Sequence, residues 1–355
     1  MTPRFHPLKV AEVRRETADA VSLCFEVPAD LAEEYRFVQG QHLNIKAAID
    51  GEELRRSYSI CAGVDDNELR VAIKKIPGGR FSGWANEQIR VGDMLDVMTP
   101  EGRFHVPLDA GNEKHYVAFA AGSGITPILS LIKTTLKAEP KSRFTLVYGN
   151  QRQSSVMFAE ALEDLKNRYL SRFALYTIFS REEQEVPLFN GRLDRARVGQ
   201  FLETLIPAED IDAAFICGPG AMIDEVENGL LAGGVPAERI HLERFGVPDS
   251  GPAHHAEPGD APHARITVVV DGLRREVEFR KEDPSILDVA LRAGMDLPYS
   301  CKGGVCCTCR AKVLEGQVRM DKNYTLEQPD VEAGYVLTCQ AHPLTERVVI
   351  SFDDR

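Results

Sequence analysis

Residues 301–309 read Cys-Lys-Gly-Gly-Val-Cys-Cys-Thr-Cys, and one more cysteine follows at position 339. The spacing Cys301-x4-Cys306-x2-Cys309, separated from Cys339 by 29 residues, is the plant-type pattern that binds a [2Fe–2S] cluster. In this pattern a short loop wraps closely around iron and a distant strand completes the cluster. The glycines between the first two cysteines let backbone N–H groups approach the sulfurs.

A structural zinc site is the alternative use of four cysteines. Such sites usually carry two paired Cys-x2-Cys knuckles, whereas this sequence has one, so the pattern favours iron and sulfide. Cys307 lies between two expected ligands, and we expect a spare thiol, with exchange for a ligand as the other role. Five of the eight cysteines fall between 301 and 339, which is typical of metal or redox chemistry in a reducing compartment.

Length and composition limit the possible classes. A chain of 355 residues allows two or three domains, and 43% hydrophobic with 27% charged residues excludes disorder, collagen or a coiled coil for its bulk. The formal net charge of −12 argues against nucleic acid or an anionic membrane as partner. The N-terminus lacks the apolar core of a signal peptide, and the longest uncharged stretch, residues 115–132, is interrupted by Gly122, Gly124 and Pro127. We therefore expect a cytoplasmic protein.

Residues 247–264 form a Pro-rich segment that is predicted to be a linker. Two regions of the chain precede it and one follows it. Its histidines, His254, His255 and His263, lack partners at ligand spacing, so they do not favour a metal site. Residues 1–110 contain short strands separated by turn signals, which predicts an antiparallel barrel. The expected strands there are Leu43–Ala47, Arg56–Cys61 and Leu69–Lys75.

Residues 111–246 alternate strand and helix, which predicts a parallel α/β sheet that binds ligands at the carboxyl ends of its strands. The expected strands are Tyr116–Ala121, Phe144–Tyr148, Phe173–Phe179 and Ala213–Cys217, and the expected helices are Pro127–Lys137, Phe158–Arg168 and Ala221–Ala232. Residues 265–355 begin with a hairpin, Ile266–Val270 and Arg274–Phe279, whose Asp271-Gly272 turn favours type I′. A short helix, Pro284–Ala293, follows.

Two further motifs suit nucleotides. Arg56-Ser57-Tyr58-Ser59 combines a guanidinium and hydroxyls for a pyrophosphate with a tyrosine face for an aromatic ring, although a half-buried strand often carries such residues. Gly122-Ser-Gly124-Ile-Thr-Pro127 follows an apolar strand and opens a helix, so its N–H groups can face phosphate. A plain turn is the alternative for this loop.

The whole chain outside the linker resembles the ferredoxin–NADP reductase superfamily with a fused C-terminal plant-type ferredoxin domain. The segments that carry the resemblance are LRRSYSIC (54–61), AAGSGITP (120–127), VYGN (147–150), ICGPGAMI (216–223) and IHLERF (240–245). They look closest to the reductases of bacterial phenylacetyl-CoA epoxidases. The resemblance implies an FAD-binding antiparallel β-barrel (1–110), an NADP-binding parallel α/β domain (111–246) and a β-grasp [2Fe–2S] domain (265–355).

The resemblance also implies roles for individual residues. Arg56 would bind the FAD pyrophosphate, Tyr58 would lie against the isoalloxazine ring, and Ser59 would lie near flavin N5. The other implied residues are Ser57, Lys74, Gly79, Arg80, Phe81, Ser82 and Thr126 around the flavin, Phe245 over its other face, and Gly122 and Gly124 in the nicotinamide nucleotide loop. Cys217 and Glu243 would join Ser59 as the catalytic residues, where the nicotinamide approaches. For Cys217, Glu243 and Phe245, ordinary packing is the alternative.

Ser180-Arg181 follows an expected strand at the place where NADPH users of the superfamily surround the 2′-phosphate. A hydroxyl and a guanidinium suit a dianion, which favours NADPH over NADH, although Glu182 and Glu183 follow at once. The implied activity is electron transfer from NADPH through FAD and the [2Fe–2S] cluster to a di-iron oxygenase that epoxidises phenylacetyl-CoA. The alternatives are a reductase for a Rieske-type oxygenase, and a non-catalytic redox sensor or scaffold.

Overall fold

The computed structural model describes residues 4–246 and 257–354, so positions 247–256 of the expected linker lie outside the described residues. The chain divides into two compact units. One contains residues 6–54 and 58–245, and the other consists mainly of residues 257–354. In the described part of the chain, no helix is long and apolar enough to span a bilayer.

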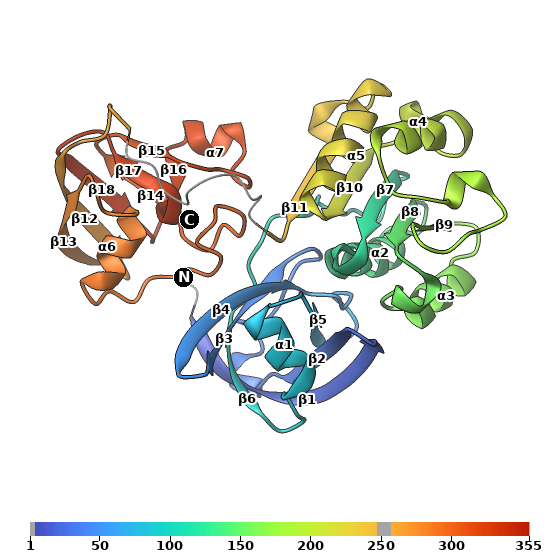
Figure 1. The fold of residues 1–355 in the computed structure, drawn as a ribbon, viewed down its shortest axis with the longest axis horizontal. Helices are drawn as coiled ribbons and strands as arrows, with labels where there is room; N and C mark the ends of the chain where they lie inside the picture. The colour runs from blue at the N-terminus through green and yellow to red at the C-terminus, as the bar shows by residue number, and fades with distance from the viewer. Residues whose placement is uncertain (1–3, 247–256, 355) are drawn as a thin grey trace. The chain divides into compact units, whose positions relative to one another are not determined.

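The first unit begins with a curled antiparallel sheet in the order β4-β3-β6-β1-β2-β5 (Figure 1). Its strands are β1 (Phe5–Thr17), β2 (Ala20–Glu26), β3 (His42–Ile49), β4 (Glu52–Ser59), β5 (Leu69–Lys74) and β6 (Met94–Met98). A bridge between Ile60, just after β4, and Val71 of β5 joins the two edge strands. The sheet therefore closes into a barrel around an apolar core, and helix α1 (Arg80–Glu87) adds Phe81 and Ala85 to that core.

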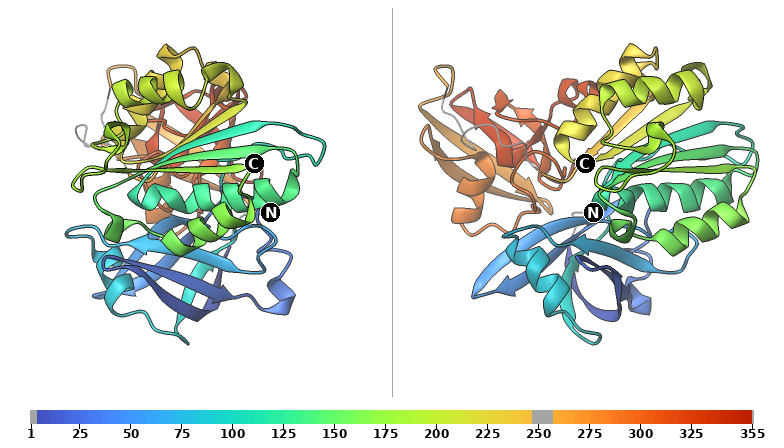
Figure 2. Two further views of the ribbon diagram at one scale, coloured as in Figure 1. Left: turned by 90° about the vertical axis from the view of Figure 1, so that its right-hand side faces the viewer. Right: turned by 45° about the vertical axis from the view of Figure 1, so that its right-hand side comes forward.

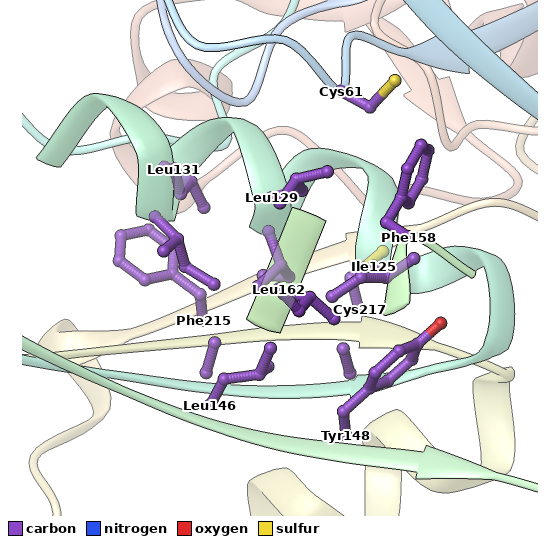
Figure 3. Close-up of a cluster of buried hydrophobic side chains, with 14 of the residues drawn as sticks. Cys61, Ile125, Leu129, Leu131, Leu146, Tyr148, Phe158, Leu162, Phe215 and Cys217 are labelled. Atoms are coloured by element: carbon purple, nitrogen blue, oxygen red, sulfur yellow. The ribbon is translucent and has the colours of Figure 1, made fainter. Parts of the chain in front are cut away.

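The same unit continues with a five-stranded parallel sheet in the order β11-β10-β7-β8-β9. Its strands are β7 (His115–Ala121), β8 (Arg143–Asn150), β9 (Phe173–Phe179), β10 (Ala213–Gly218) and β11 (Ile240–Arg244), and its helices are α2 (Ile125–Ala138), α3 (Ala159–Arg168), α4 (Arg195–Thr204) and α5 (Gly220–Ala232). Helices cover both faces of the sheet (Figure 2), each over its own apolar core. Figure 3 shows one core, where Leu129 of α2 and Leu162 of α3 lie on the same side of the sheet as Leu146 and Tyr148 of β8.

The order of these strands reverses direction in the middle of the sheet. From β7 the chain moves through β8 to β9 at one edge, and it then returns to β10 on the other side of β7. A crevice at such a switch point, beyond the carboxyl ends of the strands, is where open α/β sheets bind ligands. The strand order therefore predicts a ligand site at the loops after β7 and β10.

The second unit is a mixed sheet in the order β13-β12-β18-β14-β16, beside a short β15-β17 pair. Its elements are β12 (His263–Val270), β13 (Leu273–Arg280), α6 (Ile286–Arg292), β14 (Arg310–Glu315), β15 (Val318–Met320), α7 (Gln328–Glu332), β16 (Tyr335–Leu337), β17 (Ala341–Pro343) and β18 (Arg347–Ser351). Asp271 and Gly272 both have positive φ, as a type I′ turn requires. Strand β12 starts at His263, inside the range expected to be linker.

Candidate functional site

The four cysteines of the predicted cluster site lie together in the second unit as two pairs. The thiols of Cys301 and Cys306 are hydrogen-bonded to each other, and so are those of Cys309 and Cys339. Among the described residues, no three metal-ligating side chains lie close enough to surround a single ion. A [2Fe–2S] cluster takes two thiolates on each of two irons, whereas structural zinc takes four around one ion. The paired arrangement therefore fits the cluster.

Backbone geometry explains why the loop has this sequence. The Gly303 N–H donates to Cys301 Sγ at 3.3 Å, and the hydrogen bond from Cys306 lowers the pKa of Cys301 to about 7. Gly304 has a φ of +79°, and a Cβ there would lie 3.1 Å from the Lys322 carbonyl oxygen. A larger residue at 304 would therefore be strained and would push against the neighbouring segment.

Cys307 has a different environment. Its Sγ lies 3.2 Å from Thr325 Oγ1, and burial raises the pKa of the thiol to about 12. The structure records no hydrogen bond between Cys307 and any of the four paired cysteines in the described residues. This geometry agrees with a spare thiol.

Most of the expected flavin residues lie on β4 and around the start of α1, whereas Lys74 ends β5, Thr126 lies in α2 and Phe245 follows β11. The Tyr58 ring lies 5.6 Å from that of Phe81, which is 2% exposed and belongs to the barrel core. Ser82 Oγ accepts from the Ile76 N–H at 3.1 Å and donates to the Gly79 carbonyl at 3.3 Å, which holds the turn before α1. Phe81 and Ser82 are thus buried in the barrel, while Tyr58 remains partly exposed.

A cavity of about 390 Å³ opens beside the start of α1, and Gly79 and Arg80 are among its lining residues. Arg80 also donates to Glu52 at 2.5 Å and to the Ile49 carbonyl at 3.0 Å, so its guanidinium is held against the barrel. Lys74 Nζ lies 3.6 Å from Asp19. Arg56 is exposed on β4 and Ser57 half-buried beside it.

The structure brings the three expected catalytic residues together from distant parts of the chain. Ser59 Oγ, at the end of β4, donates to Glu243 Oε2 at 2.9 Å. Cys217 of β10 is the register partner of Glu243 on β11. Burial raises the pKa of the Cys217 thiol well above its ordinary value, and Glu243 raises it further when its carboxyl group is ionised.

Among the three expected catalytic residues, Glu243 is the carboxylic acid, and its pKa is strongly raised. Burial raises its pKa to about 8, against the opposing effect of the hydrogen bond from Ser59. The carboxyl group is therefore mostly protonated at neutral pH, with Ser59 Oγ as its immediate partner. A carboxyl with such a pKa can hold or deliver a proton at the working pH.

The glycine-rich loop lies at the switch point between β7 and β10. A Cβ on Gly124 would lie 2.0 Å from the Cys217 carbonyl oxygen, so only glycine fits this approach. Gly122 has a φ of +55° and its carbonyl accepts from Tyr148 Oη at 2.8 Å. Thr126 Oγ1 donates to the Ser123 carbonyl at 3.0 Å, which closes the first turn of α2.

Ser180 and Arg181 follow β9 at the carboxyl edge of the sheet. Their N–H groups donate to the carbonyls of Asn150 and Gln151, at 3.0 and 2.9 Å, so this segment lies beside the end of β8. That contact reveals Arg152, an exposed arginine that the sequence reasoning missed, although its position just after VYGN was a usable signal. Glu182 accepts from the Gln153 N–H at 3.0 Å and so stabilises the neighbouring turn.

Phe245 stands apart from these contacts. It follows β11 directly after Arg244 and is 43% exposed. The structure thus shows an aromatic side chain that is partly open to solvent at the end of this strand.

Comparisons with known proteins agree with this arrangement. Residues 7–106 match the oxidoreductase FAD-binding domain family, residues 119–228 the oxidoreductase NAD-binding domain family, and residues 268–344 the 2Fe-2S iron-sulfur cluster binding domain family. The chain is 51% identical to one of the subunits of the 1,2-phenylacetyl-CoA epoxidase of Escherichia coli (strain K12), over 98% of each chain.

Other relatives also align over nearly their whole length. The chain is 33% identical to the ferredoxin reductase component of 3-ketosteroid-9-alpha-monooxygenase of Rhodococcus rhodochrous, over 97% of this chain and 96% of the relative. Its fold is similar to that of phthalate dioxygenase reductase, with a TM-score of 0.59 at 23% identity over 98% of each chain. The matches confirm the fold and cofactor classes predicted from the sequence. The chain thus belongs to the family of oxidoreductases with FAD-binding, NAD-binding and [2Fe–2S] domains that includes the reductase components of multicomponent oxygenases.

Proposed function

We propose that this reductase takes electrons from NADPH and delivers them to a di-iron oxygenase that epoxidises phenylacetyl-CoA. The observation that carries the choice of partner is the 51% identity to the Escherichia coli epoxidase component across both whole chains. When bound, FAD accepts a hydride and the [2Fe–2S] cluster passes on single electrons, so together they connect a two-electron donor to a one-electron acceptor. The proposed ligands of the cluster are Cys301, Cys306, Cys309 and Cys339.

The proposed catalytic role of the chain is to position groups and to hold a proton. The loop at Gly122 and Gly124 would bind the nucleotide at the switch point, where N–H groups of the first turn of α2 would face its phosphates. Glu243 would keep its proton next to Ser59 Oγ, and Cys217 would pack against the nicotinamide. Arg56 and Tyr58 would bind the flavin, and Phe245 would exclude water from its other face.

The proposed setting is the reducing cytoplasm. All eight cysteines are free, and thiols that hold iron must stay reduced until the metal arrives. The chain would work there with a soluble oxygenase component and with NADPH as its diffusible partner.

Reconstitution with candidate oxygenases tests this function. The purified reductase should support phenylacetyl-CoA-dependent oxygen uptake with the di-iron epoxidase component, at one NADPH per oxygen consumed. A Rieske-type oxygenase is the matched comparison, because relatives of this chain at 33% and 29% identity serve a 3-ketosteroid and a glycine betaine monooxygenase. Efficient turnover with only such an oxygenase would reassign the partner and leave the electron-transfer chemistry intact.

The proposed NADPH site leads to a prediction about Arg181 and Arg152. Arg181→Ala should weaken NADPH binding by about 1.5–3 kcal/mol, because a charge-assisted hydrogen bond to the 2′-phosphate is lost. Arg152→Ala should cause a smaller loss of the same kind. KM values for NADPH and NADH measured in parallel check this, since NADH lacks the phosphate and should be used unchanged. Equal losses with both nucleotides would mean that the arginines support the loop and do not read the phosphate.

Glu243 leads to a prediction about pH and stability. The folded state holds the Glu243 proton between its ordinary pKa of 4.5 and the raised value of about 8, a range in which the unfolded chain has lost it. The free energy of unfolding should therefore fall as the pH rises through this range. Glu243→Gln, which cannot lose a proton, should remove this part of the decline.

Melting temperatures from about pH 5 to pH 9 measure the effect. The control is Glu238→Gln, at an exposed carboxylate just before β11, which should leave the pH profile unchanged. If Glu243→Gln melted with the same pH dependence as the unaltered chain, Glu243 would titrate normally and could not store a proton at neutral pH.

A further inference from the structure

Gln340 places a side-chain amide at the centre of the cysteine loop. It is 1% exposed and follows Cys339 directly in the 3-10 turn Thr338–Gln340. Its Nε2 donates to the Lys302 carbonyl at 3.0 Å, to the Cys339 carbonyl at 3.0 Å, and to Cys339 Sγ at 3.7 Å. One amide nitrogen thus connects the cysteine at 339 with the loop that carries the other three.

The orientation of this amide follows from its neighbours. Three acceptors surround Nε2, so the flipped amide would point its oxygen at two carbonyls and a sulfur and would lose every bond. The Oε1 atom, in contrast, is buried and has no hydrogen-bond partner in the described part of the chain. A buried oxygen without a hydrogen-bond partner destabilises the folded state. Packing alone would therefore be served better by an apolar side chain of similar size.

The hydrogen bond from Gln340 Nε2 is important because its acceptor, Cys339 Sγ, belongs to a proposed cluster ligand. Hydrogen bonds to a ligating sulfur stabilise the more negative, reduced form of an iron–sulfur cluster and raise its potential. At Cys301 the donor is a backbone N–H, from Gly303, which every residue except proline would supply. At Cys339 a donor is the side chain of Gln340, which can be removed by substitution.

We propose that Gln340 is a positioning residue that sets the reduction potential of the cluster, by donating from Nε2 to Cys339 Sγ while it holds the Lys302 carbonyl. This inference rests on the proposed ligand set. Gly304 contributes to the same arrangement, because a Cβ there would lie 3.3 Å from Gln340 Cγ and would press on the stem of the side chain. Gln340 thus contacts the Lys302 carbonyl and Cys339 through its amide, and lies against Gly304 through its side-chain stem.

Gln340→Leu in the full-length protein tests the proposal. The variant should keep its iron and sulfide, and the ratio of reduced to oxidised cluster at a fixed potential should fall about tenfold, which is about 59 mV for a one-electron couple. Redox titration followed by cluster absorbance and electron paramagnetic resonance measures this. The flavin potential in the same chain is the internal reference and should stay unchanged. Gln328→Leu, at an exposed glutamine of α7, is the matched control.

Gln340→Met covers the case in which leucine does not fit, since methionine is unbranched, has the same length and lacks the N–H. A fully loaded Leu or Met variant with an unchanged cluster potential would overturn the proposal. Loss of iron from both variants would also overturn it, because the glutamine would then be only an anchor of the loop. Absence of iron and sulfide from the unaltered protein is a separate result, which would contradict the ligand set itself.

Discussion

Serine at position 301, 306, 309 or 339 is expected to abolish the [2Fe–2S] cluster. Each paired thiol would supply one of two ligands to one iron, and a serine hydroxyl is a much poorer ligand for iron and sulfide than a thiolate. Iron and sulfide should fall from about two of each per chain to nearly none. NADPH oxidation with ferricyanide, which can take electrons from flavin, should survive. Reduction of cytochrome c or of the oxygenase should be almost lost.

Cys307→Ser is the matched control for this series. Its thiol belongs to the same loop, but it faces Thr325 Oγ1 instead of the pairs, so the variant should keep the cluster and its activity. Metal analysis and stopped-flow reduction of flavin and cluster would compare all five variants. A cluster that persists after serine replaces one of the four paired cysteines, or disappears with Cys307→Ser, would show that the ligands are assigned wrongly.

Gly124→Ala is expected to have the largest effect on the first unit. The new Cβ would lie 2.0 Å from the carbonyl oxygen, 2.4 Å from the carbonyl carbon of Cys217, and 2.8 Å from the Gly218 nitrogen. All three are backbone atoms of a central strand, so they cannot rotate away as a flexible side chain would. We expect a loss of about 3 kcal/mol or more in unfolding free energy, together with nucleotide binding too weak to saturate.

Gly199→Ala is the control variant for Gly124→Ala, because it adds the same methyl group at a glycine with open space around it. Gly199 lies within helix α4, and no atom is within 4 Å of the position that a Cβ would take. Alanine there should stabilise the protein by about 0.5–1 kcal/mol, because it favours the helix. Chemical denaturation of both variants, with NADPH titration, measures the two effects. Equal stability of the two variants would mean that the loop after β7 can move away from β10.

The sequence could predict the elements whose signals are local. Strand β9 has the bounds expected from its apolar run, Phe173–Phe179, and the Asp271-Gly272 turn has the two positive φ angles that type I′ requires. The cysteine spacing similarly placed all four thiols together, because three of them share one short loop. For the strand, the turn and the three-cysteine loop, neighbouring residues determine the outcome, whereas Cys339 joins the loop across 29 intervening residues.

Three helices were missed: α1, α4 and the short α7 (Gln328–Glu332). The sequences of α1 and α4 are poor helix formers. Helix α1 contains Gly83 and follows a Gly-Gly pair, and it depends on the burial of Phe81 in the barrel core. Helix α4 contains Gly199, although Asp194 at its N-cap, which accepts from the Arg197 N–H, was a readable start signal. Tertiary packing outweighed local preference in both.

The contact between Ser59 and Glu243 illustrates what sequence reasoning reaches only through resemblance. The two residues are 184 positions apart, and β11 carries no local sign that one of its side chains will contact a serine of the barrel. The raised pKa of Glu243 depends on burial by several elements, so it could be read only from the folded chain. Arg152 was missed for a related reason, since the Gln151 carbonyl beside it accepts from Arg181, which follows another strand.

The strand order β11-β10-β7-β8-β9 has a consequence for how this reductase can diverge. Gly124 packs so closely against the backbone of Cys217 that a Cβ would clash, and this contact lies at the switch point between β7 and β10. The exposed arginines 152 and 181 follow β8 and β9, toward one edge of the sheet. Under the proposed nucleotide site, in which these arginines contact the 2′-phosphate, selection could alter coenzyme preference at that edge by surface substitutions, without repacking the centre. Descendants of one ancestor could shift between NADPH and NADH while the hydride-transfer end stayed fixed.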